Sequence, residues 1–140
     1  MKPKFSNVVL ADDDTDDQMF FEMALREVSK DAELKVFKNG VELMKALDQP
    51  NAEHPDIIFL DLNMPRKNGL QCLEEIRQHE DLKAVTVVML TTSLSQMDMY
   101  KAYDKGACLF ANKPAELSKW TDLINKVFTS DPTQLEAVID

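Results

Sequence analysis

Carboxylate, hydroxyl and ammonium side chains follow the apolar runs of this sequence near the points where the runs stop. In chain order these polar residues are Asp12, Asp13, Asp61, Thr91 and Lys113. Carboxylates that lie close together repel one another, so such a group favours protonation of one member or a bound cation. Oxygen ligands of this kind favour Mg²⁺, which takes one or two carboxylates together with a phosphate oxygen. Brought together, the side chains suit transfer of a phosphoryl group to a carboxylate nucleophile.

Asp61 has the most informative surroundings. It ends the apolar run 57–60, which shows no alternation and is therefore typical of a strand buried on both faces of a parallel sheet. Pro65 lacks an N–H and fixes its own φ, so the chain leaves strand geometry there. The sequence therefore places Asp61 at the carboxyl end of a buried strand, where open α/β sheets bind their ligands.

The elements that position these side chains are predicted from periodicity. Short apolar runs alternate with segments of helical period, and the runs are 8–11, 34–37, 57–60, 86–90 and 108–111. This βα alternation predicts a doubly wound parallel sheet with right-handed crossovers. The run 34–37 is mixed in polarity, which predicts an edge strand. Because parallel strands end at one edge of the sheet, the polar residues are expected to converge there.

Each intervening segment contains a stripe of apolar residues at helical spacing. The stripes are Met19, Phe20, Met23, Ala24 and Val28; Val41, Met44 and Leu47; Leu70, Leu73 and Ile76; Met97, Tyr100 and Tyr103; and Trp120, Leu123, Ile124 and Val127. Thr15 followed by Gln18 predicts a capping box for the first helix, and Ser95 is the predicted N-cap of the fourth. The Met-rich fourth helix is expected to offer one side to the core and the other to a partner.

Composition excludes several classes of function. The net charge of −9 argues against binding to nucleic acid or to an anionic membrane surface. No apolar run is long enough for a signal peptide or a membrane span, and Cys72 and Cys108 read as reduced packing residues, so a cytoplasmic location is expected. His54 and His79 are predicted to be surface residues without ligand-like partners.

Taken together, the strand-end motifs resemble those of receiver domains from two-component response regulators. They are Val8-Val9-Leu10-Ala11-Asp12-Asp13-Asp14, Asp61-Leu62-Asn63-Met64-Pro65 with Gly69, Met89-Leu90-Thr91-Thr92-Ser93, and Lys113-Pro114. The Leu-Thr-Thr-Ser and Ala-Asn-Lys-Pro forms, with Asp81-Leu82-Lys83, are most similar to single-domain regulators typified by phytochrome-partner receivers.

The resemblance implies a flavodoxin-like, doubly wound, five-stranded parallel sheet of order 2-1-3-4-5 flanked by five helices. It implies a receiver domain over residues 1–129, a C-terminal tail over 130–140, and no output domain. Leu135, Val138 and Ile139 of the tail are compatible with either a short docked helix or a frayed end.

The resemblance also implies a role for each site residue. Asp61 accepts a phosphoryl group from a sensor histidine kinase. Mg²⁺ is ligated directly by Asp13 and Asp61, mainly through water by Asp12, and by the backbone carbonyl of Asn63. Thr91 and Lys113 bind the phosphoryl oxygens, and the Lys113–Pro114 bond is expected to be cis. Thr91 reorients on phosphorylation, and Phe110 is either an aromatic switch residue or part of the core.

The acidic run after the first strand has two other interpretations. Asp14, Asp16 and Asp17 are interpreted as the solvated start of a helix, where acids favour the positive end of the dipole. A calcium loop is excluded, because its sixth and twelfth positions hold Asp17 and Met23 in place of Gly and Glu.

Three functions then compete. The first is a phosphorylation switch that is not an enzyme, hydrolyses its own acyl phosphate slowly, and signals to a downstream protein or phosphotransfer partner, with a homodimer implied by resemblance only. The second is an aspartate-nucleophile phosphatase of haloacid-dehalogenase type, which needs a second Asp where this chain has Asn63. The third is a receiver-like binding module that works without phosphorylation.

Overall fold

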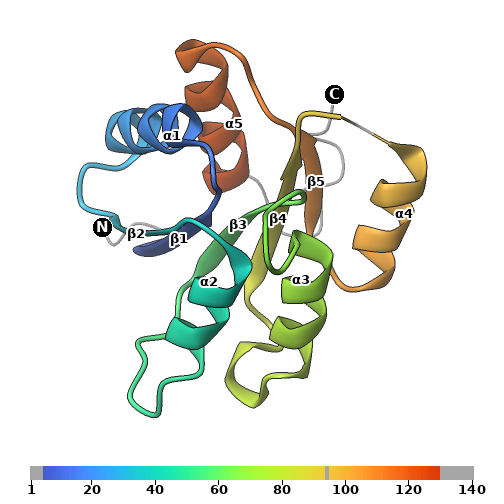
Figure 1. The fold of residues 1–140 in the computed structure, drawn as a ribbon. Coiled ribbons are helices and arrows are strands. Elements are labelled where there is room, and N and C mark those ends of the chain that lie inside the picture. The colour runs from blue at the N-terminus through green and yellow to red at the C-terminus, as the bar shows by residue number, and fades with distance from the viewer. Residues whose placement is uncertain (1–4, 94, 130–140) are drawn as a thin grey trace.

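The computed structural model describes residues 5–93 and 95–129 (Figure 1). Its five strands form one parallel sheet in the order β2-β1-β3-β4-β5. The elements are β1 (Asn7–Ala11), α1 (Thr15–Val28), β2 (Glu33–Phe37), α2 (Gly40–Leu47), β3 (Ile57–Asp61), α3 (Gly69–Gln78), a 3₁₀ turn (Glu80–Leu82), β4 (Thr86–Thr91), α4 (Gln96–Asp104), β5 (Leu109–Asn112) and α5 (Leu117–Thr129). The predicted doubly wound sheet of order 2-1-3-4-5 with five helices is confirmed.

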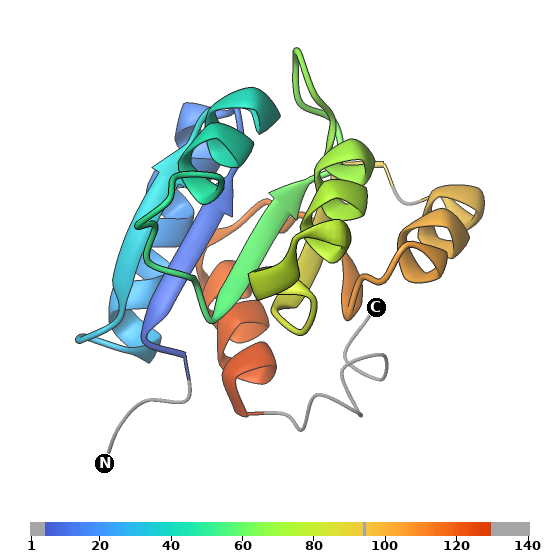
Figure 2. The ribbon, with the colours of Figure 1, turned by 90° about the horizontal axis from the view of Figure 1, so that it is seen from below.

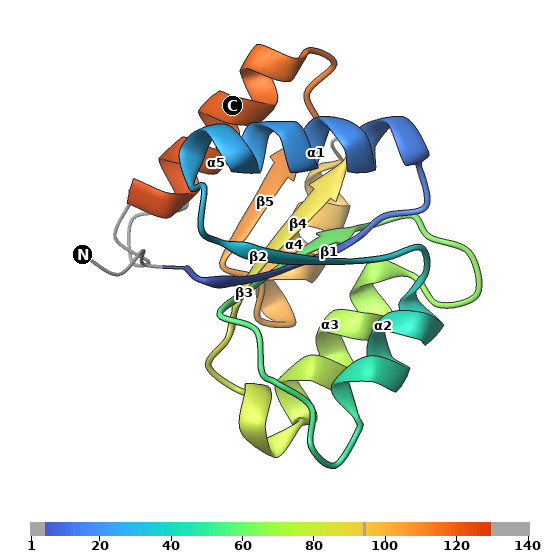
Figure 3. The ribbon, with the colours of Figure 1, turned by 90° about the vertical axis from the view of Figure 1, so that its left-hand side faces the viewer.

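The sheet lies between two layers of helices. Helices α1 and α5 cover one face, and α2 and α3 lie on the other (Figure 3). Every residue of β3 is buried. Ile58 packs with the core residues on the side of α2 and α3, whereas Ile57 and Phe59 pack with those of α1 and α5. Because successive side chains of a strand point to opposite faces, burial of both faces requires the unbroken apolar run seen in the sequence.

At the carboxyl edge of the sheet, the strand boundaries differ from the prediction by one residue. β3 and β4 extend one residue further than predicted, to include Asp61 and Thr91, and β5 is shifted to begin at Leu109. β2 lies at one edge of the sheet, as its mixed polarity predicted. Asp61 is therefore the last residue of the central strand.

The predicted capping box of α1 is wrong. Asp14 is the N-cap, and its side chain accepts a hydrogen bond from the Asp17 N–H at 3.0 Å. Gln18 Nε2 instead donates to the Asp12 carbonyl at 2.6 Å. A carboxylate caps a helix as well as a hydroxyl does, and its charge is favourable at the positive end of the helix dipole. Asp14 is the cap because it is the residue directly before the first turn.

The predicted apolar stripe of α1 is also wrong in part. Met19 and Met23 are 52% and 46% exposed, whereas Phe21, Ala24 and Leu25 are fully buried. Phe21 packs edge-on against Phe59 of β3 and Trp120 of α5, at ring-centroid distances of 4.8 and 6.0 Å. Both stripes have helical spacing, and the fit of an aromatic ring between sheet and neighbouring helix decides which one is buried.

The stripes of α2, α3 and α5 face the core largely as predicted: Met44, Leu47, Leu73, Ile76, Trp120, Ile124 and Val127 are buried. α4 differs, because Met97 and Tyr100 are 67% and 65% exposed while Ala102 is its one fully buried residue among those described. Ser95 caps this helix as predicted, accepting from the Asp98 N–H. α4 therefore presents two large apolar side chains to solvent.

Two further expectations concern the ends and bonds of the chain. The predicted tail over 130–140, with Leu135, Val138 and Ile139, lies outside the described residues. The Lys113–Pro114 bond is trans, so the predicted cis bond is wrong. The structural reason is that the trans form is the lower-energy isomer of an X–Pro bond, and this loop accommodates it.

Within residues 5–93 and 95–129, none of the helices combines the length and apolarity that a bilayer crossing needs.

Candidate functional site

The carboxyl ends of the central strands bring the predicted residues to one edge of the sheet. β3 and β4 are in register with Asp61 opposite Leu90. Immediately after β5, the Lys113 N–H donates to the Thr91 carbonyl at 2.7 Å. Gly69 lies close behind, because a Cβ at that position would come within 2.5 Å of the Asp61 carbonyl oxygen. Only glycine allows α3 to begin so near the central strand.

Three carboxylates form the centre of this edge. One oxygen from each of Asp12, Asp13 and Asp61 lies within 4.8 Å of the others. Asp12 and Asp61 are buried, whereas Asp13 is exposed. The group is therefore accessible to solvent from the side of Asp13, and two of its members are held inside the protein.

Lys113 neutralises part of this charge. Its Nζ lies 2.9 Å from Asp12 Oδ2, 3.0 Å from Asp17 Oδ2 and 3.2 Å from Asp61 Oδ2. The Lys113 side chain is only 5% exposed. One ammonium thus contacts three carboxylates in a place that water hardly reaches.

Burial changes the acidity of these groups. It raises the pKa of Asp61 from 3.8 to about 6; Lys113 opposes the rise, and the negative charge of Asp12 adds to it. Burial likewise raises the pKa of Asp12, against the attraction of Lys113. Burial alone would lower the pKa of Lys113, but Asp12, Asp17 and Asp61 outweigh it and the net pKa is raised. At neutral pH Asp61 is mostly ionised and Lys113 is charged.

The site fits a hard divalent cation. Asp12 Oδ2 is buried, and its partner among the described residues is the Lys113 ammonium at 2.9 Å. The other oxygen of this carboxylate, Oδ1, accepts from the Asp14 N–H at 2.9 Å. A buried carboxylate oxygen with unused lone pairs, next to two further carboxylates, has the donor chemistry that Mg²⁺ or Mn²⁺ prefers.

Asn63 and Thr91 lie beside the carboxylates with different partners. The Asn63 N–H donates to Asp61 Oδ1 at 3.2 Å, which orients the carboxylate from the β3–α3 loop. The Thr91 hydroxyl donates to the Ser93 carbonyl and accepts from the Ser93 N–H. The structure therefore places Thr91 at the expected edge, with its hydroxyl engaged by the loop that follows β4.

Phe110 is fully buried in β5, within the core on the side of α2 and α3. Its backbone N–H donates to the Tyr103 hydroxyl of α4 at 3.1 Å. Burial is the state expected of a core residue, and it leaves the predicted switch role as a hypothesis. The contact does join β5 to α4 directly.

Asp17 is the site residue that the sequence interpretation missed. The charge pattern predicts that Asp17 belongs to a solvated helix start, but its carboxylate contacts Lys113 and its side chain is only 19% exposed. Asp17 lies four residues before Phe21, on the face of α1 that turns toward the sheet. The correct buried stripe would have placed Asp17 beside the strand ends, so the two errors have one cause.

The two histidines also have partners that the sequence did not predict. His54 and His79 lie with ring centroids 6.2 Å apart. His54 Nε2 is 3.5 Å from Asp81 Oδ2, and His79 Nε2 is 3.6 Å from Asp48 Oδ1. Each contact is a single ion pair and not a set of metal ligands, so the expectation that the two histidines lack ligand-like partners stays a prediction.

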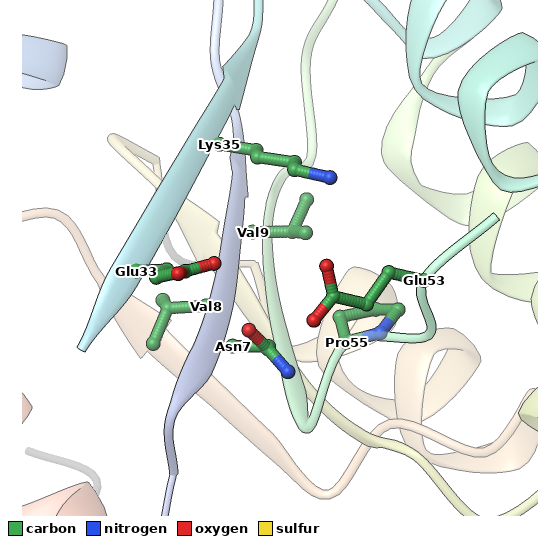
Figure 4. A pocket seen from close by; sticks show the side chains of 7 residues that line it. All are labelled: Asn7, Val8, Val9, Glu33, Lys35, Glu53 and Pro55. Carbon is green, nitrogen blue, oxygen red and sulfur yellow. The ribbon is translucent and has the colours of Figure 1, made fainter.

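One hollow described in the structure lies at the amino edge of the sheet, away from the carboxylates. This hollow (Figure 4), about 20 Å³ in volume, is lined by Asn7, Val8, Val9, Glu33, Lys35, Glu53 and Pro55. It lies at the amino ends of β1 and β2 and has the size of one water molecule. The three convergent carboxylates lie at the opposite edge of the sheet, where the parallel strands end; Figure 2 shows the arrowheads that mark those ends.

The fold and this acidic edge of the sheet place the chain among the receiver domains of two-component signalling. The model of the response regulator receiver domain matches residues 8–125. The chain belongs to this family of signalling proteins.

Relatives within the family agree with this assignment. The response regulator Rcp1 of Synechocystis is 33% identical over 135 residues, which cover 94% of this chain and 90% of Rcp1. The phosphorylated cyanobacterial phytochrome response regulator RcpA superposes with a TM-score of 0.80 at 31% identity, covering 87% of this chain and 90% of RcpA. The Mn²⁺-bound form of Rcp1 gives 0.79 at 30% identity, covering 87% of this chain and 91% of that one. The similarity to single-domain phytochrome response regulators is confirmed.

Proposed function

We propose that this chain is a phosphorylation switch in which Asp61 accepts a phosphoryl group from a histidine kinase in a Mg²⁺-dependent reaction. The observation that carries the proposal is the Asp61 carboxylate itself, buried at the end of β3, 3.2 Å from Lys113 and within 4.8 Å of the oxygens of Asp12 and Asp13. An acceptor carboxylate, a counter-charge and two ligand carboxylates are the parts that this chemistry requires.

The reaction begins with the ionised Asp61 carboxylate. One of its oxygens forms a bond to phosphorus, the bond between phosphorus and the donor imidazole nitrogen breaks, and that nitrogen retains the electron pair. The Lys113 ammonium binds an oxygen of the transferred group, and the Thr91 hydroxyl donates to another. The Asn63 N–H keeps the carboxylate oriented while this happens. Both donors act where negative charge gathers, which is how such sites lower the barrier.

Asp12, Asp13, Asp61 and the Asn63 backbone carbonyl are the residues proposed to hold Mg²⁺. A bound divalent cation screens the incoming phosphoryl charge from the carboxylates. The convergence of the Asp12, Asp13 and Asp61 carboxylate oxygens within 4.8 Å supports this assignment, as does the Mn²⁺-bound form of the related Rcp1. We propose that Asp13, which is exposed, and Asp61 ligate directly, and that Asp12 acts mainly through water.

Output is proposed to follow from Thr91. To reach a phosphoryl group its hydroxyl must leave Ser93, and the loop after β4 moves with it. That loop leads into α4, which contacts the Phe110 N–H through Tyr103. Met97 and Tyr100 on the exposed side of α4 then form part of a surface for a downstream protein, a phosphotransfer partner or a second copy of the chain. Equal sedimentation of the phosphorylated and unphosphorylated forms would exclude the dimer.

We further propose a receiver domain over residues 1–129 that signals through protein contacts and operates in the cytoplasm, where its two free cysteines stay reduced. Because RcpA is described as a phytochrome response regulator, a kinase of phytochrome type is the first donor to test. Turnover as a phosphatase is not proposed, because the Asn63 amide is too weak an acid to protonate a leaving group, and hydrolysis of the acyl phosphate is expected to be slow.

The test uses acetyl phosphate as donor, with phosphorylated and free protein separated on phosphate-affinity gels. We expect labelling of the wild type with Mg²⁺, no labelling with EDTA, and no labelling of Asp61→Asn. Asp56→Asn is the matched control, because Asp56 is an acid just before β3 whose carboxylate bonds Ser6 and Asn7 far from the site. Many turnovers of donor per chain would support a phosphatase instead, and an unlabelled but folded wild type would support a binding module.

A further inference from the structure

Lys113 has more partners than its proposed role requires. An ammonium has three N–H donors, and Asp12, Asp17 and Asp61 all lie within 3.2 Å of Nζ. A phosphoryl group on Asp61 brings new acceptor oxygens that also need this ammonium. These oxygens replace the Asp61 carboxylate as partners of Lys113, and the ammonium can turn fully toward them only by loosening its contact with Asp12 or Asp17.

The three carboxylates differ in what else is proposed to stabilise them. Asp12 accepts from the Asp14 N–H and lies in the proposed cation site. Asp61 becomes an acyl phosphate and loses its carboxylate charge. For the Asp17 carboxylate, Lys113 is the partner that the structure gives. Asp17 is therefore the carboxylate that loses its counter-charge in the phosphorylated state.

The position of Asp17 is built into the fold. Its N–H donates to the capping carboxylate of Asp14 at 3.0 Å, which fixes the first turn of α1. Four residues on, Phe21 is fully buried against β3 and α5. With 19% exposure against 5% for Lys113, the pair is too buried for solvent to screen it as it would a surface ion pair.

We propose that Asp17 is a positioning residue that competes with the phosphoryl group for Lys113, and so favours the unphosphorylated state. The proposal rests on the function proposed above and adds a regulatory contact to the same site. In the unphosphorylated protein Asp17 keeps the ammonium at the mouth of the site. Phosphorylation must break this ion pair, so the phosphorylated state is populated less than it would be without Asp17.

The test measures binding of beryllofluoride, a probe that resembles a phosphoryl group, by ¹⁹F NMR titration with Mg²⁺ in excess. Asp17→Asn removes the competing charge and is expected to lower the Kd about tenfold, the low end of what one charge-assisted contact contributes. Asp17→Glu keeps the charge and is expected to restore most of the wild-type Kd. Asp16→Asn is the matched control, one residue away and exposed, and should change the Kd less than about twofold.

A spectroscopic readout separates positioning from loss of structure. The bound fluorine nearest the ammonium should shift in Asp17→Asn and not in Asp16→Asn, while the melting curves of both remain cooperative. In a Lys113→Met background, Asp17→Asn should no longer tighten binding beyond the Asp16→Asn control.

The outcomes distinguish this inference from the proposed function. If beryllofluoride fails to bind the folded wild type, the phospho-acceptor function itself is wrong. If it binds the wild type but Asp17→Asn leaves the Kd unchanged or raises it, the phospho-acceptor function stands and the competition by Asp17 is wrong. The same holds if Asp17→Asn is equally effective without Lys113.

Discussion

Two basic side chains join separate segments at opposite edges of the sheet, and they do so with different partners. Lys113, at the carboxyl edge, contacts the carboxylates of Asp12, Asp17 and Asp61. Arg77 of α3, toward the amino edge, donates to backbone carbonyls. Its carbonyl acceptors are Gly106 at 2.7 and 3.0 Å, Val85 at 2.7 Å, Lys83 at 3.1 Å and Leu82 at 3.3 Å, and Cys108 Sγ accepts more weakly at 3.8 Å.

The difference lies in whether the partners can be exchanged. Carboxylates that compete for one ammonium can be replaced by an incoming anion, so the Lys113 contacts can change without unfolding the chain. Backbone carbonyls around a guanidinium have no competitor, and they connect the loops that enter β4 and β5 to α3. We therefore assign Lys113 to the chemistry and Arg77 to the fixed framework that carries α4. This assignment can be broken by changing each residue in turn.

The largest effect is expected at Lys113. Lys113→Met removes the donor to the phosphoryl group, so phosphorylation by acetyl phosphate should slow by about 10²- to 10³-fold, the usual consequence of losing one preorganised donor. Lys119→Met, an exposed lysine of α5, is the control and should keep the wild-type rate. The rates come from gel time courses with Mg²⁺ present. A folded Lys113→Met protein that is labelled at the wild-type rate would remove Lys113 from the chemistry.

Arg77 should show the opposite pattern. Arg77→Met leaves several carbonyls without their shared donor and is expected to lower the free energy of unfolding by about 2 kcal/mol. The loss should be the same with Mg²⁺ or EDTA, and the final extent of phosphorylation should not change. Urea unfolding measures it, with Arg66→Met as control, because Arg66 is 59% exposed and lies 4.0 Å from Glu42. A stability loss that Mg²⁺ reverses would mean that Arg77, like Lys113, belongs to the chemical site and not to the fixed framework.

A pH effect is expected from Asp61 in EDTA. Its pKa is raised from 3.8 to about 6 by burial, so the folded chain binds this proton more tightly than the unfolded chain does. Stability from this group is complete below the unfolded pKa and is lost as pH rises through the folded value. Between roughly pH 5 and 7.5 the wild type should therefore lose about 1.5 kcal/mol in free energy of unfolding relative to Asp61→Asn, which has no carboxyl group to titrate at this position.

Urea unfolding at the two pH values provides this comparison, and Asp16→Asn is the control because Asp16 is exposed. The free energy of unfolding of Asp61→Asn minus that of the wild type should rise with pH. The same difference for Asp16→Asn should stay constant. If this difference for Asp61→Asn falls as pH rises, burial is not the main influence on the pKa of Asp61.

The smallest effect is expected from the cap of α1. Asp14→Ala removes the acceptor of the Asp17 N–H and should cost about 1 kcal/mol in urea unfolding. Mg²⁺ affinity, measured by calorimetric titration, should change less than about threefold, because Asp14 is not among the three carboxylates that converge. Asp16→Ala should leave both quantities near wild type. A large loss of Mg²⁺ affinity in Asp14→Ala would extend the metal site beyond its predicted residues.

Much of this arrangement could be predicted from the sequence because it depends on period and position. The unbroken run before Asp61 indicates a strand buried on both faces, and parallel strands necessarily end together. Sheet order and the convergence of Asp12, Asp13, Asp61 and Lys113 follow from that rule and from the resemblance to receiver domains.

What escaped prediction depends on three-dimensional fit. Two stripes of α1 have helical spacing, and only the packing of Phe21 against Phe59 and Trp120 selects one of them. That choice also decides whether Asp17 faces solvent or Lys113. Arg77 was not predicted because its acceptors are backbone carbonyls, which leave no mark on the sequence.

The most direct test of the account is to locate the acyl phosphate. Wild-type protein is incubated with acetyl phosphate and Mg²⁺, reduced with borohydride, which converts an aspartyl phosphate to homoserine, and mapped by peptide mass spectrometry. The account predicts homoserine at position 61 and unchanged Asp at positions 12, 13 and 17. Homoserine at any of those three positions in place of 61, in folded wild-type protein, would contradict it.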